Sequence, residues 1–387
     1  MLTDGVCEIS NVPNITDVHL LIEMMKILGS NIEFKNGCLH IDNRNAHNAK
    51  IDTNYASKLR ASYYFMGVLL SKYGKAEIAY PGGCVIGSRP INFHIEGFKK
   101  LGAKVEIEDD NKYLITAEKL VGTDIFFDIA SVGATLNIMF AAVKAEGTTR
   151  IFNAAKEPEI VNVASFLNTM GAKVYGAGTS QITIEGVSEL HDGIVEVIPD
   201  RIEAGTYIMM GSLLGNNLEI KGVLKEHLGA VLTKLQEVGC KFIYKDNSII
   251  VNKTEHLKPV NIKTLVYPGF VTDLGQPMST FLTQCEGDSI FEETIYENRM
   301  RHVKYLNMMG ASIDADNKIA YIHGKTPLHG TNVEATDLRA GAAMLFAGMI
   351  ADGTTVISNI EHILRGYENI VDKLSNVGAS IKIIEED

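Results

Sequence analysis

Tryptophan is absent from this 387-residue sequence, and cysteine is scarce, with five residues. Cys7, Cys38, Cys84, Cys240 and Cys285 form no CxxC pair and no Cys/His ligand spacing, so neither a disulfide framework nor a metal site is indicated. Four of them, all except Cys84, fall in strand or buried-helix patterns, which predicts small core residues. The cysteine usage favours a reducing compartment, and we expect a cytoplasmic protein.

Long hydrophobic runs and an excess of positive charge are also lacking. The longest apolar run, residues 340–351, is too short to span a bilayer and predicts a buried helix, and the N-terminus lacks the features of a signal peptide. The 36 Lys and Arg against 47 Asp and Glu give a net charge of −11, which disfavours nucleic acid and anionic membranes as partners. An anionic substrate would therefore need a local cluster of arginines.

The composition, with 46% hydrophobic and 21% charged residues, is that of an ordinary globular protein. One sequence pattern recurs six times: an apolar helix end, a glycine, a small or polar residue, and a strand of alternating polar and apolar residues. The six glycines are Gly29, Gly102, Gly171, Gly239, Gly310 and Gly378, spaced 68 to 73 residues apart. A glycine there fits a left-handed helix C-cap, and the alternation predicts a half-buried strand. The sequence thus predicts six similar units.

Helices rich in small apolar residues lead five of these units. They are predicted at residues 60–73, 131–146, 200–214, 273–286 and 337–352. Because they are apolar nearly all round, they must be buried. The fold class is therefore predicted as α/β, built from six β-α-β-α-β-β repeats whose internal helices are covered by sheets and outer helices.

Five such helices for six caps leave the first repeat incomplete. The first cap, Gly29, also comes about forty residues earlier than the repeat interval predicts. We expect the chain to start inside its first repeat. Either the first repeat was shortened in this lineage, or the true start codon lies further upstream. The neighbours of the missing helix should then expose apolar surface and lower the stability.

The border between the third and fourth repeats falls near residues 198–200. This predicts a three-repeat domain at 1–198 with the Cys84 loop, and another at 199–387 with Asp273, Arg339 and Arg365, joined by a hinge beside a ligand cleft. Helices of the second domain begin after Asp200, Thr272 with Asp273, and Asp337, which predicts side-chain N-caps. Such helix ends favour anions.

The loop at residues 81–90 is the most unusual segment. It contains three Gly, two Pro, Cys84 and Arg89, which indicates an exposed, mobile loop in which a thiol can react. Composition alone leaves two interpretations of Cys84, a functional thiol or an incidental loop cysteine.

Ten motifs, in order along the whole chain, together resemble the UDP-N-acetylglucosamine 1-carboxyvinyltransferases, the enolpyruvyl transferases that open peptidoglycan synthesis. They lie at residues 58–62, 81–90, 131–135, 155–160, 199–206, 267–270, 272–273, 297–299, 337–342 and 365–367. The resemblance implies a two-domain inverted α/β barrel. It also implies transfer of the enolpyruvyl group of phosphoenolpyruvate to the 3′-hydroxyl of UDP-N-acetylglucosamine, with release of phosphate and without a metal or organic cofactor.

The resemblance also implies roles for individual residues. Cys84 matches the family's general acid, the target of epoxide inhibitors such as fosfomycin, and Asp273 matches the residue that accepts the proton of the sugar hydroxyl. Three arginines match those that hold phosphoenolpyruvate or the nearby loop, where a guanidinium fork suits carboxylate and phosphate: Arg89, Arg339 and Arg365. Four more residues match positions lining the substrate cleft: Arg60 and Ser131 as nucleotide contacts, Ile295, and Arg299, which is either a substrate contact or a salt-bridge partner.

Departures from the family pattern leave a second hypothesis open. A Lys-Asn pair expected on the first buried helix has no counterpart, and Leu364 and Asn92 replace acidic residues. The alternative is a paralogue that binds UDP-N-acetylglucosamine without turnover. The related 5-enolpyruvylshikimate-3-phosphate synthases share the repeat and reaction type, but the Pro-Gly-Gly-Cys loop at 81–84 argues against them.

Overall fold

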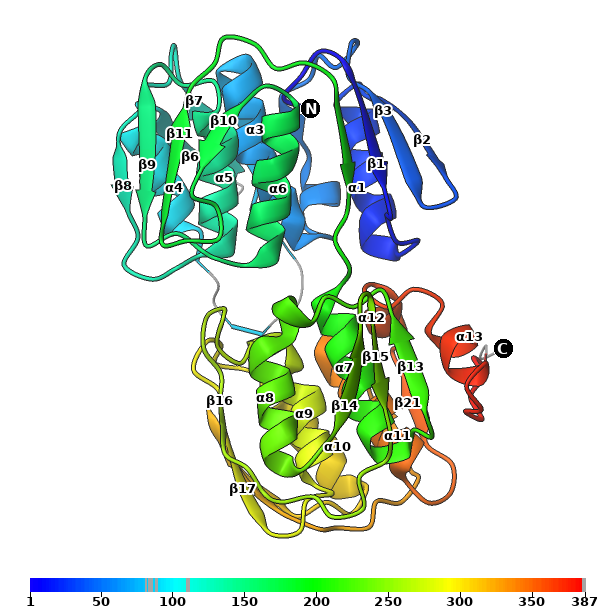
Figure 1. The fold of residues 1–387 in the computed structure, drawn as a ribbon. Coiled ribbons are helices and arrows are strands. Elements are labelled where there is room, and N and C mark those ends of the chain that lie inside the picture. Colours follow the sequence, from blue (N-terminus) through cyan, green and yellow to red (C-terminus); the bar gives the residue numbers. More distant parts are fainter. Residues whose placement is uncertain (81, 83–85, 88–89, 109–111, 385–387) are drawn as a thin grey trace. The chain divides into compact units, whose positions relative to one another are not determined.

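The computed structural model describes residues 1–80, 82, 86–87, 90–108 and 112–384, and Figure 1 shows its fold. The chain divides into two compact units whose border along the sequence lies between Ile198 and Pro199, with Ile86 and Gly87 grouped with the second unit. Each unit has its own hydrophobic core.

The first unit contains three four-stranded sheets of one topology within its described residues: a parallel edge strand, a central strand and an antiparallel hairpin. The orders are β12-β1-β3-β2, β4-β5-β7-β6 and β8-β9-β11-β10. The strands are β1 (Val6–Ser10), β2 (Asn31–Lys35), β3 (Cys38–Asp42), β4 (Lys50–Ile51), β5 (Lys75–Ala79), β6 (Lys104–Glu108), β7 (Lys112–Thr116), β8 (Asp124–Phe126), β9 (Thr148–Phe152), β10 (Lys173–Tyr175), β11 (Gln181–Glu185) and β12 (Gly193–Glu196). Because β12 pairs parallel with β1, the last strand of this unit completes its first sheet.

The second unit repeats this topology once in full, as β16-β17-β19-β18. Its other two sheets have three strands, β13-β15-β14, and two strands, β20-β21, in the part of the chain that the structure describes. The strands are β13 (Leu218–Lys221), β14 (Phe242–Lys245), β15 (Ser248–Val251), β16 (Ile262–Lys263), β17 (Asp288–Glu292), β18 (Ile313–Asp316), β19 (Ile319–His323), β20 (Asn332–Glu334) and β21 (Val356–Ser358).

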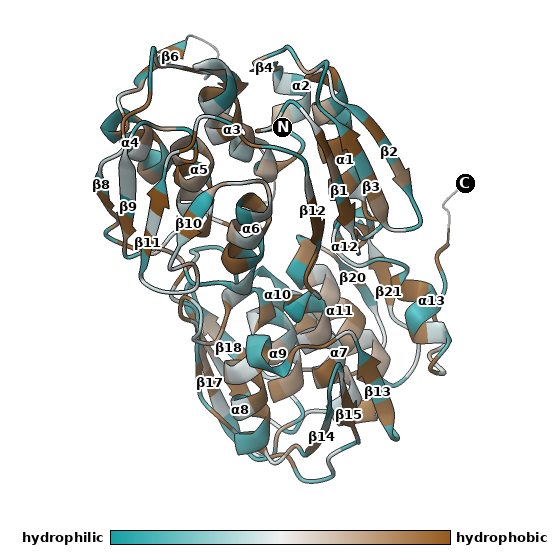
Figure 2. Cartoon of the chain, turned by 45° about the horizontal axis from the view of Figure 1, so that its top comes forward, coloured by the Kyte–Doolittle hydropathy of each residue, from teal (hydrophilic) through white to brown (hydrophobic). Residues whose placement is uncertain are grey.

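Small-residue helices form the interior of both units, and the sheets surround them (Figure 1). The buried helices are α3 (Tyr64–Tyr73) after the 3-10 turn η1 (Arg60–Tyr63), α5 (Val132–Ala142), α7 (Arg201–Leu214), α9 (Gly275–Leu282) after η3 (Thr272–Leu274), and α11 (Leu338–Ile350). All five lie where the sequence predicted buried helices. Figure 2 shows α5 and α11 mainly in hydrophobic colours, as complete burial requires.

The remaining helices lie nearer the surface. They are α1 (Thr16–Ile27), α2 (Thr53–Ala56), α4 (Asn92–Lys100), α6 (Pro158–Thr169), η2 (Lys225–Leu228), α8 (Gly229–Val238), α10 (Arg301–Met308), α12 (Glu361–Leu364) and α13 (Ile370–Ser375). Apart from additional short helices, the predicted β-α-β-α-β-β order is complete in four repeats, for example β8-α5-β9-α6-β10-β11. The α/β class with helices inside and sheets outside is confirmed, and the described strands form separate sheets rather than one closed barrel.

The six predicted glycine caps are confirmed at the level of individual hydrogen bonds. All six glycines have φ between +94° and +117°, in the left-handed region. After each glycine, the next residue donates its N–H to the carbonyl five residues earlier at 2.9 to 3.0 Å, as in Ala172 to Leu167 and Cys240 to Leu235. This is the bond that closes a Schellman cap. The repeat is therefore a repeat of backbone geometry.

Two expectations from the sequence are not met. The segment 380–384 was predicted as the strand after Gly378, but it forms no strand. After the other caps, the strand pairs with the next strand in its hairpin, and the described residues offer no such partner here. Apolar surface was expected beside the helix that the repeat count predicts to be absent, yet no exposed large apolar side chain among the described residues lies on α3 or α5. Tyr64, Val68 and Phe140 there are half-buried.

None of the helices in the described residues combines the length and the apolar character needed to cross a bilayer. The apolar run at 340–351 instead forms most of the buried helix α11, as predicted.

The cap geometry gives a stability test within one helix. Gly239, the C-cap of α8, has φ +117°, and an added Cβ would lie 3.4 Å from the His256 carbonyl oxygen. We expect Gly239→Ala to lower the free energy of unfolding by about 1–2 kcal/mol through backbone strain. Gly229, the first residue of the same helix, has φ −46° and open space around the added Cβ. Gly229→Ala should raise the free energy of unfolding by about 0.4–1 kcal/mol.

Urea and thermal unfolding midpoints of the two variants check this prediction. A shift of the same sign in both would contradict it.

Candidate active site

The predicted site residues are divided between the two units. Arg60 and Ser131 lie in the first unit, and Asp273, Ile295, Arg299, Arg339 and Arg365 lie in the second. Cys84 and Arg89 lie outside the described residues. Four of these side chains, Arg60, Ser131, Asp273 and Arg339, lie at the N-terminal ends of buried helices.

A carboxylate between two guanidinium groups forms the centre of the site in the second unit. Asp273, in the turn η3 before α9, accepts a hydrogen bond from Arg299 Nη2 at 2.6 Å through Oδ1 and one from Arg339 Nη2 at 3.2 Å through Oδ2. The Arg299 side chain is only 4% exposed, whereas that of Asp273 is 37% exposed. The cluster therefore has a buried side and a side that solvent or a ligand can reach.

The charges of this cluster determine how Asp273 ionises. Burial alone would raise the pKa of the Asp273 carboxyl, but the positive charges of Arg339 and Arg299 outweigh that effect and hold the pKa well below its usual range. Burial would likewise lower the pKa of Arg339, but the charge of Asp273 outweighs this effect and raises it. Asp273 and Arg339 are thus both charged at neutral pH.

Asp337 supports the cluster from the start of α11. Its Oδ1 accepts the N–H groups of Arg339 at 3.0 Å and Ala340 at 3.1 Å, as the sequence predicted for an N-cap, and lies 3.9 Å from Arg299 Nη1. Gln276 Nε2 donates to the Arg299 carbonyl at 3.1 Å and to Asp337 Oδ2 at 3.4 Å. Arg299 thus lies between two carboxylates.

The predicted capping role of Asp273 and Thr272 is wrong. No side chain caps η3 or α9. Asp273 lies within η3, and its carboxylate instead accepts hydrogen bonds from Arg299 and Arg339, which come from distant parts of the chain. The predicted cap at Asp200 is confirmed, since its Oδ1 accepts the N–H groups of Ile202 and Glu203 at 2.7 and 3.2 Å.

Two aromatic side chains border the arginines. The Arg299 guanidinium lies 5.2 Å from the centre of the Tyr296 ring, and the Arg339 guanidinium lies 6.0 Å from that of Tyr367. Tyr367 is fully buried, and its hydroxyl lies 3.0 Å from the Thr206 hydroxyl on α7. Arg365, two residues before Tyr367, is half-buried directly after α12, and Ile295 is half-buried in the segment leading to Arg299.

In the first unit, Tyr63 links the two predicted nucleotide contacts. The Arg60 guanidinium lies 5.6 Å from the centre of the Tyr63 ring, and Ser131 caps α5 by accepting the N–H of Ala134 at 3.3 Å. A Cβ on Gly133 would lie 2.7 Å from the Tyr63 hydroxyl, so this ring packs on the first turn of α5. Arg60 and Ser131 are therefore brought to one end of the helix pair α3–α5.

A buried polar network that the sequence analysis missed supports this end. Asn137 donates to the Tyr63 carbonyl at 3.0 Å and to His94 Nδ1 at 2.8 Å, and its oxygen accepts the Gly67 N–H at 2.9 Å. Burial and the Arg60 charge lower the pKa of His94 to about 3, so its ring is neutral and can accept this bond. The available signal was the polar Asn137 among the otherwise apolar residues 136–142 of a predicted helix.

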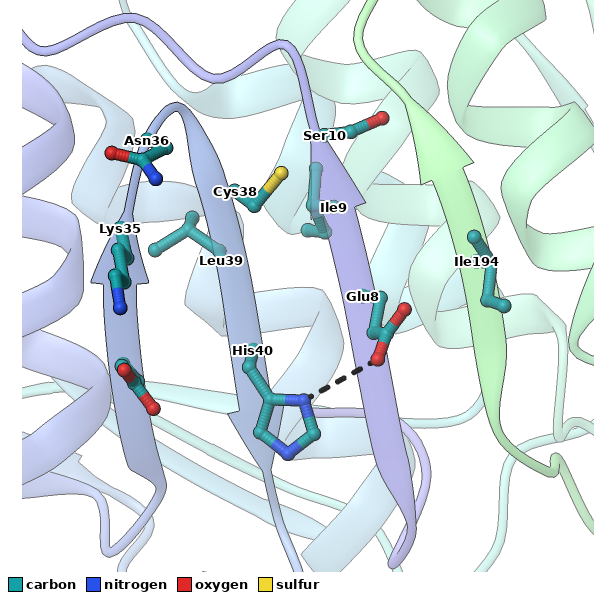
Figure 3. A pocket seen from close by; sticks show the side chains of 10 residues that line it. Glu8, Ile9, Ser10, Lys35, Asn36, Cys38, Leu39, His40 and Ile194 are labelled. Carbon is teal, nitrogen blue, oxygen red and sulfur yellow. Dashed lines mark ion pairs between the residues drawn. The ribbon is translucent and has the colours of Figure 1, made fainter.

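A separate hollow of about 380 Å³ lies on the outer face of the sheet β12-β1-β3-β2 (Figure 3). Its lining includes Cys38, Glu8 and His40, with Glu8 3.6 Å from His40 Nδ1. None of the predicted site residues that the structure describes lines it. The prediction that Cys38 is a core residue is wrong, because Cys38 lies on the outward face of β3, whereas Cys7, Cys240 and Cys285 are buried as predicted.

The Asp273 cluster predicts how the free energy of unfolding depends on pH. Asp273→Asn leaves the buried Arg299 with a weaker counter-charge, and we expect the free energy of unfolding to fall by about 1–2 kcal/mol at pH 7, a buried-pair value reduced for the exposure of Asp273. Because the folded pKa lies below the unfolded value near 3.9, the stabilisation is complete above that value and is lost only as the pH drops toward the folded pKa.

The difference between wild type and Asp273→Asn should therefore stay constant from about pH 5 to 8 and shrink in more acidic solution. Chemical unfolding across this range measures it. Asp288→Asn is the matched control, because Asp288 is 76% exposed and pairs only at the surface with His323. A loss of similar size in the control would contradict the interpretation.

The whole chain is similar to known proteins. The family model of EPSP synthase (3-phosphoshikimate 1-carboxyvinyltransferase) matches residues 1–374. The chain is 47% identical to UDP-N-acetylglucosamine 1-carboxyvinyltransferase 2 of Streptococcus thermophilus over 388 residues, covering 100% of this chain and 92% of that protein. It is 48% identical to UDP-N-acetylglucosamine 1-carboxyvinyltransferase of Clostridium botulinum, covering 98% and 91%.

Among solved structures, the fold is similar to that of the enolpyruvyl transferase NikO from Streptomyces tendae, with a TM-score of 0.89 at 24% identity over 98% of this chain and 91% of that one. An EPSP synthase from Acinetobacter baumannii gives a TM-score of 0.74 at 17% identity, covering 97% and 91%. The solved structures confirm the fold. The sequence identity to the two carboxyvinyltransferases is much higher, and it identifies the family. The chain belongs to the UDP-N-acetylglucosamine 1-carboxyvinyltransferases, within the EPSP synthase family.

Proposed function

We propose that this protein transfers the enolpyruvyl group of phosphoenolpyruvate to the 3′-hydroxyl of UDP-N-acetylglucosamine and releases phosphate, the first committed step of peptidoglycan synthesis. The observation that carries the proposal is the partly exposed Asp273 carboxylate held between Arg299 and Arg339, in a chain close to half identical to proteins named for this transfer. A base beside fixed positive charges suits a reaction between a hydroxyl and an anionic substrate.

The reaction divides into an addition and an elimination. In the addition, the sugar oxygen bonds to C2 of phosphoenolpyruvate, its proton goes to the Asp273 carboxylate, and the methylene carbon C3 receives a proton from Cys84. In the elimination, the bond from C2 to the phosphate oxygen breaks, C3 returns a proton to the Cys84 thiolate, and phosphate leaves with the proton that Asp273 had accepted. Atoms and charge balance without an oxidant, a metal or an organic cofactor.

Arginines stabilise the charges of this reaction. In the proposal, Arg89, Arg339 and Arg365 hold the carboxylate and phosphate of phosphoenolpyruvate through bidentate hydrogen bonds. Arg299 is largely buried under Asp273 and Asp337, which favours the salt-bridge role left open by the sequence. It orients Asp273, while the segment around Ile295 lines the sugar site.

Substrate binding should also make Asp273 a stronger base. A carboxylate whose pKa is strongly lowered is a weak proton acceptor. When an anionic substrate occupies Arg339, part of the positive charge that lowers the pKa of Asp273 is neutralised, and the pKa rises. Asp273 would then become a better base only when phosphoenolpyruvate is present.

In the proposal, residues of the first unit bind the nucleotide part of UDP-N-acetylglucosamine. Arg60 offers a cation, and the N-terminus of α5 at Ser131 offers partial positive charge for the diphosphate of UDP. We place the reaction in the cytoplasm, as the cysteine usage favours, with no nucleic acid or membrane partner.

Phosphate release tests the proposal directly. With phosphoenolpyruvate and UDP-N-acetylglucosamine, the chain should release phosphate, and Cys84→Ala should lower the rate by about 10²-fold or more, the usual contribution of general acid–base catalysis. Cys38→Ala is the matched control, because Cys38 is exposed on β3 and lines a hollow that contains neither Arg60 nor Ser131. It should leave the rate unchanged.

Shikimate 3-phosphate, the acceptor suggested by the family model's description, should not replace the sugar nucleotide. Release that requires shikimate 3-phosphate, or tight binding of UDP-N-acetylglucosamine without any release, would refute the proposal.

A further inference from the structure

Glu293 is a buried carboxylate that the proposed reaction does not use. It directly follows β17 and is only 1% exposed. A carboxylate removed from water is costly unless hydrogen bonds satisfy its oxygens. The hydrogen bonds that Glu293 accepts therefore show what this charge is for.

Four uncharged donors converge on Glu293. Oε1 accepts the Thr264 hydroxyl at 2.9 Å and the N–H groups of Ile295 at 2.7 Å and Tyr296 at 3.2 Å, and Oε2 accepts the Thr272 hydroxyl at 2.7 Å. The Thr264 hydroxyl in turn accepts the Thr294 N–H at 2.8 Å. One carboxylate thus joins three segments: the residue after β16, the start of η3, and the loop after β17.

Two of these segments carry the candidate active site. Thr272 is the residue before Asp273, and the loop that begins at Thr294 runs through Ile295 to Arg299. The 2.6 Å contact between Arg299 and Asp273 joins these two segments directly. Glu293 joins the same segments a second time, through Thr272 and Ile295. The distance between the Asp273 carboxylate and the Arg299 guanidinium therefore depends on both links.

We propose that Glu293 is a positioning residue for the enolpyruvyl transfer: its carboxylate holds the Asp273 turn against the loop of Ile295 and Arg299. This inference rests on the proposed function and adds a residue to it. Glu293 touches no substrate in this account. It acts through Thr272 on the base and through two backbone amides on the loop that lines the sugar site.

The donor pattern explains why a carboxylate stands here and predicts a graded series of variants. An amide has one acceptor oxygen and one donor group. In Glu293→Gln the oxygen can still accept the two amides, and the amino group can face Thr272, whose hydroxyl is able to turn and accept. Glu293→Ala leaves the donors of both segments unsatisfied. Thr272→Val removes only the link to the Asp273 turn.

Steady-state kinetics of the full chain tests the series. We expect kcat to fall by about 3- to 10-fold in Glu293→Gln and Thr272→Val and by about 10²-fold in Glu293→Ala, because misplacement by about 1 Å costs that much. Glu292→Gln is the matched control. Glu292 is the neighbouring acid on the same strand, and its surface ion pair with Lys263 at 2.8 Å serves no site residue.

Positioning predicts that kcat falls in Glu293→Gln and Thr272→Val even where the melting temperature stays within a few degrees of wild type. The KM for phosphoenolpyruvate should change less than kcat. Equal activity of Glu292→Gln, Glu293→Gln and Thr272→Val would overturn the proposal, as would losses that follow only the melting temperatures.

Amide hydrogen exchange separates this proposal from the proposed function, since it needs no turnover. In Glu293→Gln and Glu293→Ala, exchange should quicken both at residues 272–274 and at 294–299, and Glu292→Gln should leave both segments unchanged. Faster exchange in the loop alone would overturn the link to Asp273. If wild type released no phosphate, the proposed function would fail, and the exchange pattern would still decide whether Glu293 holds the two segments together.

Discussion

The close approach of the buried helices α7, α9 and α11 is the constraint on which the second unit depends. The Thr280 hydroxyl of α9 donates to the Ala343 carbonyl of α11 at 3.2 Å. A Cβ on Gly205 of α7 would lie 2.6 Å from Leu274 of η3, the turn that leads α9, and one on Gly341 of α11 would lie 2.5 Å from Ile363 of α12. Larger side chains at these positions would push the helices apart. Because the helices are this close, their N-terminal ends place Asp273 and Asp337 on either side of Arg299.

Burying Arg299 makes this arrangement specific. A guanidinium that is 4% exposed needs counter-charges and hydrogen-bond acceptors, and Asp273, Asp337 and Gln276 supply them. The carboxylate of Asp273 then reaches Arg339 as well, which is less deeply buried. Two guanidinium groups are thereby balanced by two carboxylates at one place in a chain with a net charge of −11, and in the proposal the anionic substrate binds there at Arg339.

The same plan recurs in the first unit with different chemistry. Three-ten turns lead α3 and α9 and carry Arg60 and Asp273, whereas side-chain caps lead α5 and α11, with Ser131 and Asp337. The repeat therefore presents helix N-termini in both units. Neutral Ser131 leaves the positive end of α5 available, while charged Asp337 neutralises that of α11 and holds Arg299.

The sequence by itself determined the repeat, the six left-handed glycine caps and the five buried helices. These features depend on local rules, since a positive φ selects glycine and an all-apolar helix must be buried. The candidate site residues were available through the family resemblance, and the family itself is confirmed by the relatives. Their assigned roles remain predictions, and Cys84 and Arg89 lie outside the described residues.

Only the tertiary structure decided which side chains meet and which face each strand presents. It brought Arg339 to Asp273 across 66 residues, turned Cys38 outward, and took Asp273 away from the capping role that its position before α9 suggested. Glu293 could have been noticed, because Ser289, Phe291 and Glu293 alternate on the inner face after Asp288, yet its four donors come from three segments. Such contacts depend on how segments distant in sequence pack together, and no local pattern encodes that packing.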